Sequence, residues 1–178
     1  MCIASIPYFS EIIVMAFSCI ECGHRSSEIK HGGGMSDKAT KIVFTALGER
    51  DLHRDVFKSD SCELSIPEVG LEMSPGTQGS MYTTMEGLFD QTITHLKKAN
   101  PFGSGDSKES KDFLAFIDKL TDYKDGKVFP FTIILDDPLS NCFIYNANAP
   151  EDCPQTKITV YERTHEQNEE LGINQMNV

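Results

Sequence analysis

The sequence predicts a mainly β protein with an α insertion: a partial zinc ribbon followed by a β-sandwich, jelly-roll-like domain that carries a helical hairpin. A Cys-x-x-Cys-Gly turn lies near the start, many short strands separated by turn residues follow, and two helical stretches interrupt them. The chain has 178 residues and 39% hydrophobic content, which is enough for a core. We place the partial ribbon at residues 1–32 and the β-sandwich domain at residues 33–178.

The cysteine turn is a candidate metal site. Cys19 and Cys22 are separated by two residues, so both thiolates can reach one ion, and Gly23 lets the chain bend back. A structural zinc site has four tetrahedral ligands. We predict Cys19 and Cys22 as metal ligands and zinc as a possible cofactor, with only half of the expected ligand set present. Cys2 or His24 could add a weak ligand, or two chains could share one ion in a zinc-bridged dimer.

The other cysteines indicate a reducing compartment, because the chain shows no extracellular signature. We expect Cys62 and Cys142 to be small core residues within strands, and Cys153 to be a free thiol in a polar loop. A redox role for the Cys19–Cys22 pair is disfavoured, because thioredoxin-like chemistry places such a pair at a helix N-terminus. Two ordinary thiols remain the alternative to zinc ligation.

Composition limits the classes of partner. The net charge is −11 and the isoelectric point is about 4.8, so binding to nucleic acid phosphates is disfavoured and a basic protein partner fits better. Residues 1–20 are apolar, but they lack a basic start and are interrupted by Pro7 and Glu11. We therefore expect neither a signal peptide nor a membrane span.

Alternating apolar and polar residues predict the strands. Residues 6–30 indicate a strand, the cysteine turn and a second short strand, and residues 41–47 form a β-rich run. Alternation in residues 62–73 changes parity at Pro67, which favours a bulge or an edge position. A continuous apolar run predicts a buried strand at residues 131–135, and further strands are predicted at residues 143–145 and 157–161.

The helices are predicted from capping residues and 3.6-residue periodicity. Thr83 and Glu86 form a capping box that begins an α-hairpin over about residues 83–120. The first helix should end near Asn100, and a Gly/Ser-rich loop at residues 102–110 should precede the second helix. A polar C-terminal helix is expected over about residues 162–171, ending at Gly172.

The ordered set of motifs resembles the zinc-finger proteins of the ZPR type over nearly the whole chain. The matching pieces are Ile6-Pro7-Tyr8-Phe9, Cys19-x-x-Cys22-Gly23-His24-Arg25, Asp51-Leu52, Arg54-Asp55, Lys58-Ser59, Ile66-Pro67-Glu68, Thr83-Thr84-Met85-Glu86-Gly87-Leu88, Asp136-Asp137-Pro138 and Tyr161-Glu162-Arg163-Thr164. In that family a module consists of a four-cysteine zinc ribbon followed by a β-sandwich with a helical hairpin. The chain looks like the second of two such modules.

The resemblance implies a protein-binding, chaperone-type role and no enzymatic activity. Proteins of this type are associated with the folding of translation elongation factor 1-alpha, and also with receptor tyrosine kinase tails and the survival-of-motor-neuron complex. It further implies a cytoplasmic and nuclear location. A second Cys-x-x-Cys is expected upstream of Ile6, but only five residues precede Ile6 here. We therefore expect half a ribbon, as in a fragment or a truncated, non-functional or regulatory paralogue.

An alternative from another class is a ligand-binding or hydrolase β-sandwich that uses Asp136 and Asp137. Paired carboxylates can perform acid–base chemistry. However, adjacent residues at a strand end point in different directions, and Asp-Asp-Pro suits a turn. A concave pocket lined by both carboxylates would favour the hydrolase.

Overall fold

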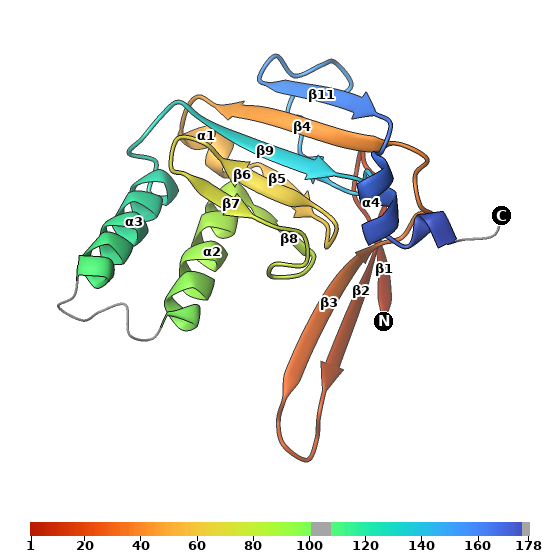
Figure 1. The fold of residues 1–178 in the computed structure, drawn as a ribbon, viewed down its shortest axis with the longest axis horizontal. Coiled ribbons are helices and arrows are strands. Elements are labelled where there is room, and N and C mark those ends of the chain that lie inside the picture. The colour runs from red at the N-terminus through yellow and green to blue at the C-terminus, as the bar shows by residue number, and fades with distance from the viewer. Residues whose placement is uncertain (101–107, 176–178) are drawn as a thin grey trace.

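The computed structural model describes residues 1–100 and 108–175. Figure 1 shows two layers of strands, two long helices on one side and a narrow sheet that projects from the body. The strands are β1 (Cys2–Ser5), β2 (Glu11–Ser18), β3 (Arg25–His31), β4 (Ala39–Ala46), β5 (Asp55–Lys58), β6 (Glu63–Ile66), β7 (Leu71–Met73), β8 (Met81–Thr84), β9 (Phe131–Asp137), β10 (Phe143–Ile144) and β11 (Thr156–Tyr161). The helices are α1 (Glu49–Leu52), α2 (Met85–Ala99), α3 (Lys108–Lys124), α4 (His165–Glu170) and a 3₁₀ turn (Ile173–Gln175).

The predicted β-sandwich with a helical hairpin is confirmed. A five-stranded sheet has the order β11-β4-β9-β6-β7, and a three-stranded sheet has the order β10-β5-β8. Strand β9 lies at the centre of the larger sheet, and its residues alternate between buried and half-buried from Phe131 to Asp137. The sequence predicted this strand from its continuous apolar run, which is typical of a strand at the centre of a sheet.

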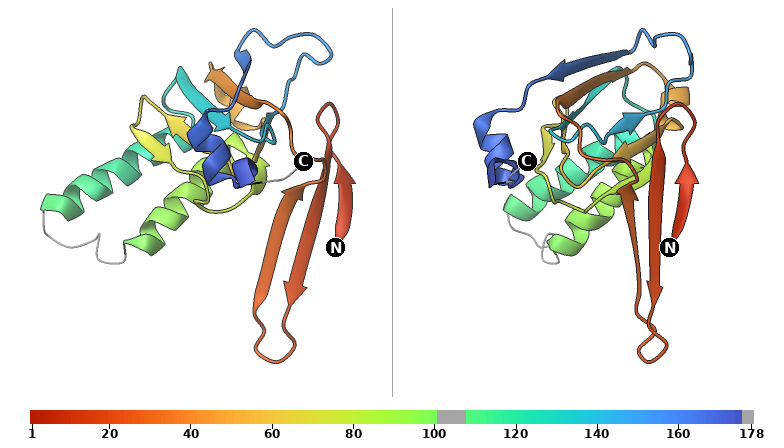
Figure 2. Two further views of the ribbon diagram at one scale, coloured as in Figure 1. Left: turned by 45° about the vertical axis from the view of Figure 1, so that its right-hand side comes forward. Right: turned by 90° about the vertical axis from the view of Figure 1, so that its right-hand side faces the viewer.

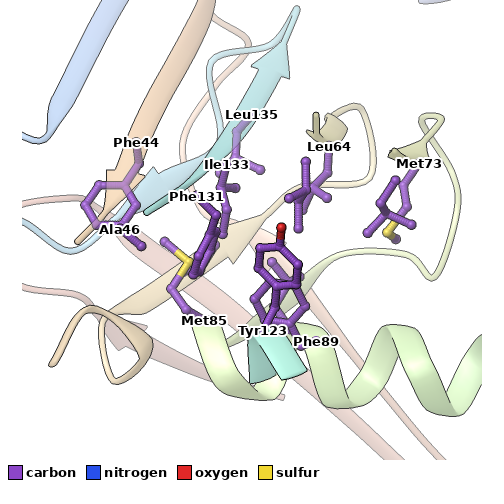
Figure 3. Close-up of a cluster of buried hydrophobic side chains, with 14 of the residues drawn as sticks. Phe44, Ala46, Leu64, Met73, Met85, Phe89, Tyr123, Phe131, Ile133 and Leu135 are labelled. Atoms are coloured by element: carbon purple, nitrogen blue, oxygen red, sulfur yellow. The ribbon is translucent and has the colours of Figure 1, made fainter. Parts of the chain in front are cut away.

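Aromatic and aliphatic side chains from both layers and the helices fill the core (Figure 3). Phe131 of β9 contacts Phe89 of α2 and Tyr123 of α3 edge to face, with ring centroids 5.6 and 5.4 Å apart. Phe44 and Leu64 are fully buried beside them. Burial of apolar surface therefore joins the helical hairpin of α2 and α3 to the sandwich. Each Å² of apolar surface that is buried stabilises the fold by about 25 cal/mol. No helix in residues 1–100 or 108–175 is long and apolar enough to cross a membrane.

Several element boundaries correct the sequence predictions. Pro67 lies in the tight turn between β6 and β7, not at a bulge, because the chain reverses there and the two strands pair with each other. The N-cap of α2 is Thr84, whose hydroxyl accepts from the Gly87 N–H, whereas Thr83 belongs to β8 and pairs with Val56. The predicted loop at residues 102–110 lies outside the described residues except for its last three, which begin α3.

The C-terminal helix is also shorter than predicted. It begins at His165 instead of residue 162, because Thr164 is its N-cap and forms a capping box with Gln167. Gly172 follows the helix with φ +72°, a left-handed conformation that suits glycine after a helix end.

A buried ion pair connects α1 to the loops around β10 and β11. The Arg54 Nε donates to Asp51 Oδ1 at 2.8 Å, and another guanidinium nitrogen donates to Gln155 Oε1 at 2.7 Å. Asp51 also accepts from the Leu47 N–H and the Gln155 amide, both at 2.8 Å. The Arg54 guanidinium lies 5.0 Å from the Phe44 ring centroid. The same guanidinium also donates to the backbone carbonyl of the residue after β10 at 3.2 Å, so the α1 region, the end of β10 and the segment before β11 meet at one cation.

This network makes stability depend on pH. Burial raises the pKa of the Asp51 carboxyl, but the hydrogen bonds from Leu47, Gln155 and Arg54 outweigh it and leave the pKa below its usual value. A carboxyl with a lowered folded-state pKa stabilises the fold above its unfolded pKa of about 4, and this contribution is lost as the pH falls further. We expect urea unfolding between pH 6 and about 3 to show a steeper loss of stability in the wild type than in Asp51→Asn.

The matched control is Glu49→Gln, which removes an exposed carboxylate of the same short helix without affecting Arg54. Its stability should follow the wild-type pH curve. Identical slopes for the wild type and Asp51→Asn would contradict the assignment.

Candidate metal centre

The cysteine turn lies at the end of the projecting sheet. Strands β2 and β3 form a long antiparallel hairpin with Ser18 paired to Arg25, and β1 pairs with the base half of β2. Figure 2 shows the hairpin extending away from the sandwich, with its turn at the far end. The predicted strand, turn and strand are confirmed, and β1 is an addition that the sequence did not indicate.

An aromatic cluster joins the base of this sheet to the sandwich. Phe9, in the turn between β1 and β2, lies with its ring centroid 4.8 Å from that of Phe143 and 5.9 Å from that of Phe57. Ile6 and Ile12 are buried in the same cluster. The base is therefore held on the sandwich while the turn remains exposed.

The backbone of the turn brings the two thiols to one side. The Cys19 N–H donates to the His24 carbonyl at 2.8 Å, and the Gly23 N–H donates to the Cys19 carbonyl at 3.0 Å. Gly23 has φ +70°, which a residue with a side chain would rarely adopt. The sequence prediction that this glycine lets the chain bend back is confirmed.

The electrostatics of the turn favour a thiolate. The Cys22 backbone N–H, the Cys22 thiol and the Glu21 N–H together lower the pKa of Cys19. Metal ligation requires deprotonated cysteine. Cys19 is half-buried and Cys22 is exposed, so both sulfurs are accessible to an ion. The donor set therefore fits two of the four positions around a zinc ion.

The described residues do not complete that set. No group of three His, Cys, Asp or Glu side chains in residues 1–100 and 108–175 could hold a metal ion, so His24 does not join the pair. Cys2 pairs with Val14 in the β1–β2 ladder, and Val14 is four residues from Ser18. At about 3.3 Å per residue, Cys2 lies roughly 13 Å along the strand from the turn. Two further ligands would have to come from outside these residues.

The other sequence candidates lie away from the turn. Cys62 and Cys142 are buried as expected, but each lies one residue before a strand instead of within it. Cys153 is a free thiol in a loop, as expected, but it is buried, and its sulfur lies 3.6 Å from an Arg54 nitrogen. Sequence reasoning gave Arg54 no chemical role, although its short Asp-x-x-Arg spacing was a usable signal.

Asp136 and Asp137 diverge from each other. Asp136 contacts Lys41 at 3.0 Å and accepts from the Tyr161 hydroxyl at 2.6 Å. Asp137 is fully buried and accepts from two serine hydroxyls and from the N–H groups of Leu139 and Asn141. This is the turn role that the sequence favoured, and the two carboxylates share no pocket lining.

Two family models match the chain. The ZPR1 zinc-finger domain matches residues 1–37, which include the cysteine turn, and the ZPR1 jelly-roll domain matches residues 50–173, which include most of the sandwich. The chain belongs to the ZPR1 family. The resemblance to ZPR-type zinc-finger proteins is thereby confirmed.

Curated ZPR1 relatives support the same assignment. Zinc finger protein ZPR1 of Bos taurus is 39% identical over 99% of this chain and 39% of its own length. Zinc finger chaperone zpr1 of Schizosaccharomyces pombe is 40% identical over the same shares. An uncharacterized ZPR1-like protein of Methanocaldococcus jannaschii is 27% identical over 83% of this chain and 73% of its own length. The chain thus spans about 39% of the length of its eukaryotic relatives.

ZPR1 membership supports zinc as the cofactor, because the matched N-terminal model is a zinc-finger domain. In a ZPR1 module of this shape, zinc would hold the ends of β2 and β3 together through sulfur ligands. Cys19 and Cys22 are the residues of this chain placed to supply them.

Proposed function

We propose that this ZPR1-family chain is a zinc-finger protein-binding module of chaperone type. The observation that carries the proposal is the projecting hairpin, which presents apolar side chains beside the cysteine turn. Ile20 is 98% exposed and Phe17 is 61% exposed. Exposed apolar groups gathered at one place indicate an interaction surface. The name of the fission yeast relative, a zinc finger chaperone, supports the same role.

Translation elongation factor 1-alpha is the partner that we propose, and the cytoplasm and nucleus are the proposed locations. Both follow from the resemblance to ZPR-type proteins. The net charge of −11 suits a basic protein partner and disfavours nucleic acid. Zinc held by Cys19 and Cys22 would order the turn so that Ile20 is presented rigidly.

Capture of purified elongation factor 1-alpha by the immobilised chain tests the proposal. We expect Ile20→Ser and Phe17→Ser to reduce capture strongly, because each removes an exposed apolar contact from the proposed surface. Both side chains are exposed, so the substitutions should leave the packing of the core unaffected. The control is Leu47→Ser, which changes an apolar residue beside α1 that is as exposed as Phe17. No capture by the wild type, or equal capture by all variants, would contradict the proposal.

A zinc-bridged dimer is a second candidate, favoured by the two-thiol turn at an exposed end. Two such turns would supply four sulfur ligands to one ion. Metal content and solution mass distinguish the candidates: half an ion per chain in a dimer supports sharing, whereas a zinc-loaded monomer contradicts it.

A further inference from the structure

The five-stranded sheet has an uncovered inner face at β11. Ile158 lies opposite Ile42 of β4, and Val160 lies opposite Thr40. Residues opposite each other in an antiparallel pair share one face. Ile42 is buried in the core, so Ile158 and Val160 also face inward, yet they are 62% and 60% exposed. The smaller sheet therefore does not extend beneath β11.

The edge of β11 is open as well. Strand β11 is the first in the order β11-β4-β9-β6-β7, so among the described residues no strand pairs with its other side. The Thr45 N–H donates to the Gln155 carbonyl at 2.9 Å. Because hydrogen bonding alternates along an antiparallel ladder, residues 157 and 159 bond to β4, while Ile158 and Val160 direct their N–H and C=O groups outward.

A groove continues this face toward the smaller sheet. Its volume is about 460 Å³, and its apolar lining includes Ile42, Ile144, Ile158, Phe9 and Pro150. Strand β10, on the opposite wall, is also an edge strand. The Tyr145 N–H donates to the Asp55 carbonyl at 2.8 Å, so the alternate residue Ile144 directs its backbone groups away from β5. Open main-chain groups and apolar side chains thus surround one elongated space.

The charge around the groove favours a basic occupant. Glu151 and Asp152 precede β11 and Glu162 follows it, and all three are exposed. The lysine of the strand, Lys157, lies on the outer face because it is opposite Val43, not the inward-facing Ile42. Lys38 is paired with Glu162 at 2.7 Å, so the acidic charge that remains beside the groove is that of Glu151 and Asp152. Apolar side chains preceded by two carboxylates match an extended segment with apolar residues along the groove and basic residues at one end.

We propose that β11 and its groove bind an extended segment of a partner protein by strand addition, with apolar side chains on Ile158 and Val160 and basic side chains toward Glu151 and Asp152. Main-chain hydrogen bonds to an exposed sheet edge give affinity, and alternate side chains give specificity. The proposal rests on the protein-binding role above, but it uses a surface remote from the cysteine turn, as Figure 1 shows.

Fluorescence anisotropy tests this on the full chain with a labelled peptide that alternates valine and threonine and carries two lysines at one end. We expect Ile158→Lys to weaken binding about tenfold or more, since it removes an apolar contact at the edge. Thr159→Lys is the matched control, because Thr159 is exposed on the outer face and the change in charge is the same. It should shift affinity about twofold at most, a shift expected of an exposed rim charge. Equal losses in the two variants would indicate attraction by net charge alone and overturn the proposal.

A second pair of measurements isolates the main-chain contribution. The same peptide with its backbone nitrogens methylated at alternate positions cannot complete the ladder, and it should not bind. Ile158→Pro removes an outward N–H that no strand of the fold uses, so it should block the peptide while the thermal unfolding curve stays cooperative. Binding of the methylated peptide, or no binding of the unmodified one, overturns strand addition.

The result is separable from the elongation factor experiment. Intact peptide binding with no capture of elongation factor 1-alpha contradicts the proposed function and retains the edge site. Capture of elongation factor 1-alpha with no peptide binding supports the proposed function and contradicts the edge site. Dimers that Ile158→Pro abolishes would show that a second copy occupies the edge, and would overturn the choice of partner.

Discussion

Replacing Asp137 with alanine is expected to destabilise the fold by about 3 kcal/mol or more, because several buried donors would lose their acceptor. Its carboxylate accepts from the Ser59 hydroxyl at 2.7 Å, the Ser61 hydroxyl at 2.6 Å and the Asn141 N–H at 2.7 Å. These groups come from the segment after β5 and the turn after β9. Urea unfolding by circular dichroism measures the loss.

Asp136→Ala is the matched control for this prediction. Its side chain is 26% exposed and is paired with the half-exposed Lys41, so we expect a loss of about 1 kcal/mol. The Tyr161 hydroxyl, which donates to Asp136, is half-buried and keeps the hydrogen bond that it accepts from the Gln167 amide at 3.1 Å. Equal losses of unfolding free energy in the two variants would show that the contacts of Asp137 with the serines and the turn stabilise the fold no more than the contacts of Asp136 do.

Substitution of Cys19 or Cys22 by serine is expected to lower the zinc affinity more than about a hundredfold. Loss of an outer hydrogen-bond partner of a metal ligand already costs 10- to 100-fold, and loss of a ligand should cost more. Zinc affinity of the wild type should rise with pH until both thiols are deprotonated, and the lowered pKa of Cys19 moves this rise to a lower pH than an ordinary thiol would show. Competition with a zinc-chelating dye gives the affinity.

Cys2→Ser is the control for the zinc prediction, since it removes an exposed thiol of the same sheet that pairs opposite Val14, far from the turn. It should bind zinc as the wild type does. Retained affinity in Cys19→Ser, an equal loss in Cys2→Ser, or a wild-type chain that takes up no zinc would contradict the ligand assignment.

Strands with a clear apolar pattern could be predicted from the sequence, whereas a strand that contains a buried charged residue could not. The pattern of β9 and the parity change at Pro67 are visible without a structure, although the change marks a turn between two strands. Strand β5 was missed because Lys58 makes it look polar. In the fold the Lys58 side chain is fully buried, and its ammonium donates to the carbonyls of Ser59 and Thr77, both at 3.3 Å. Such compensation depends on residues distant in sequence.

The sequence also could not locate the start of a helix where two neighbouring residues of the same type could each cap it. Thr83 and Thr84 are both plausible N-caps, and only the pairing of Thr83 with Val56 in the β5–β8 ladder leaves Thr84 as the cap. Cys153 is a free thiol in a loop, as expected, but the sequence did not show that it is buried against Arg54, 99 residues earlier.

The sequence by itself determined the family, the β-sandwich with its helical hairpin, and the cysteine turn as the candidate zinc site, because local spacing and residue type carry those signals. The tertiary structure alone decided that Cys2 and His24 do not join Cys19 and Cys22, and that β11 keeps an open apolar edge. These properties depend on strand register and on which layer covers which face, and long-range pairing sets both.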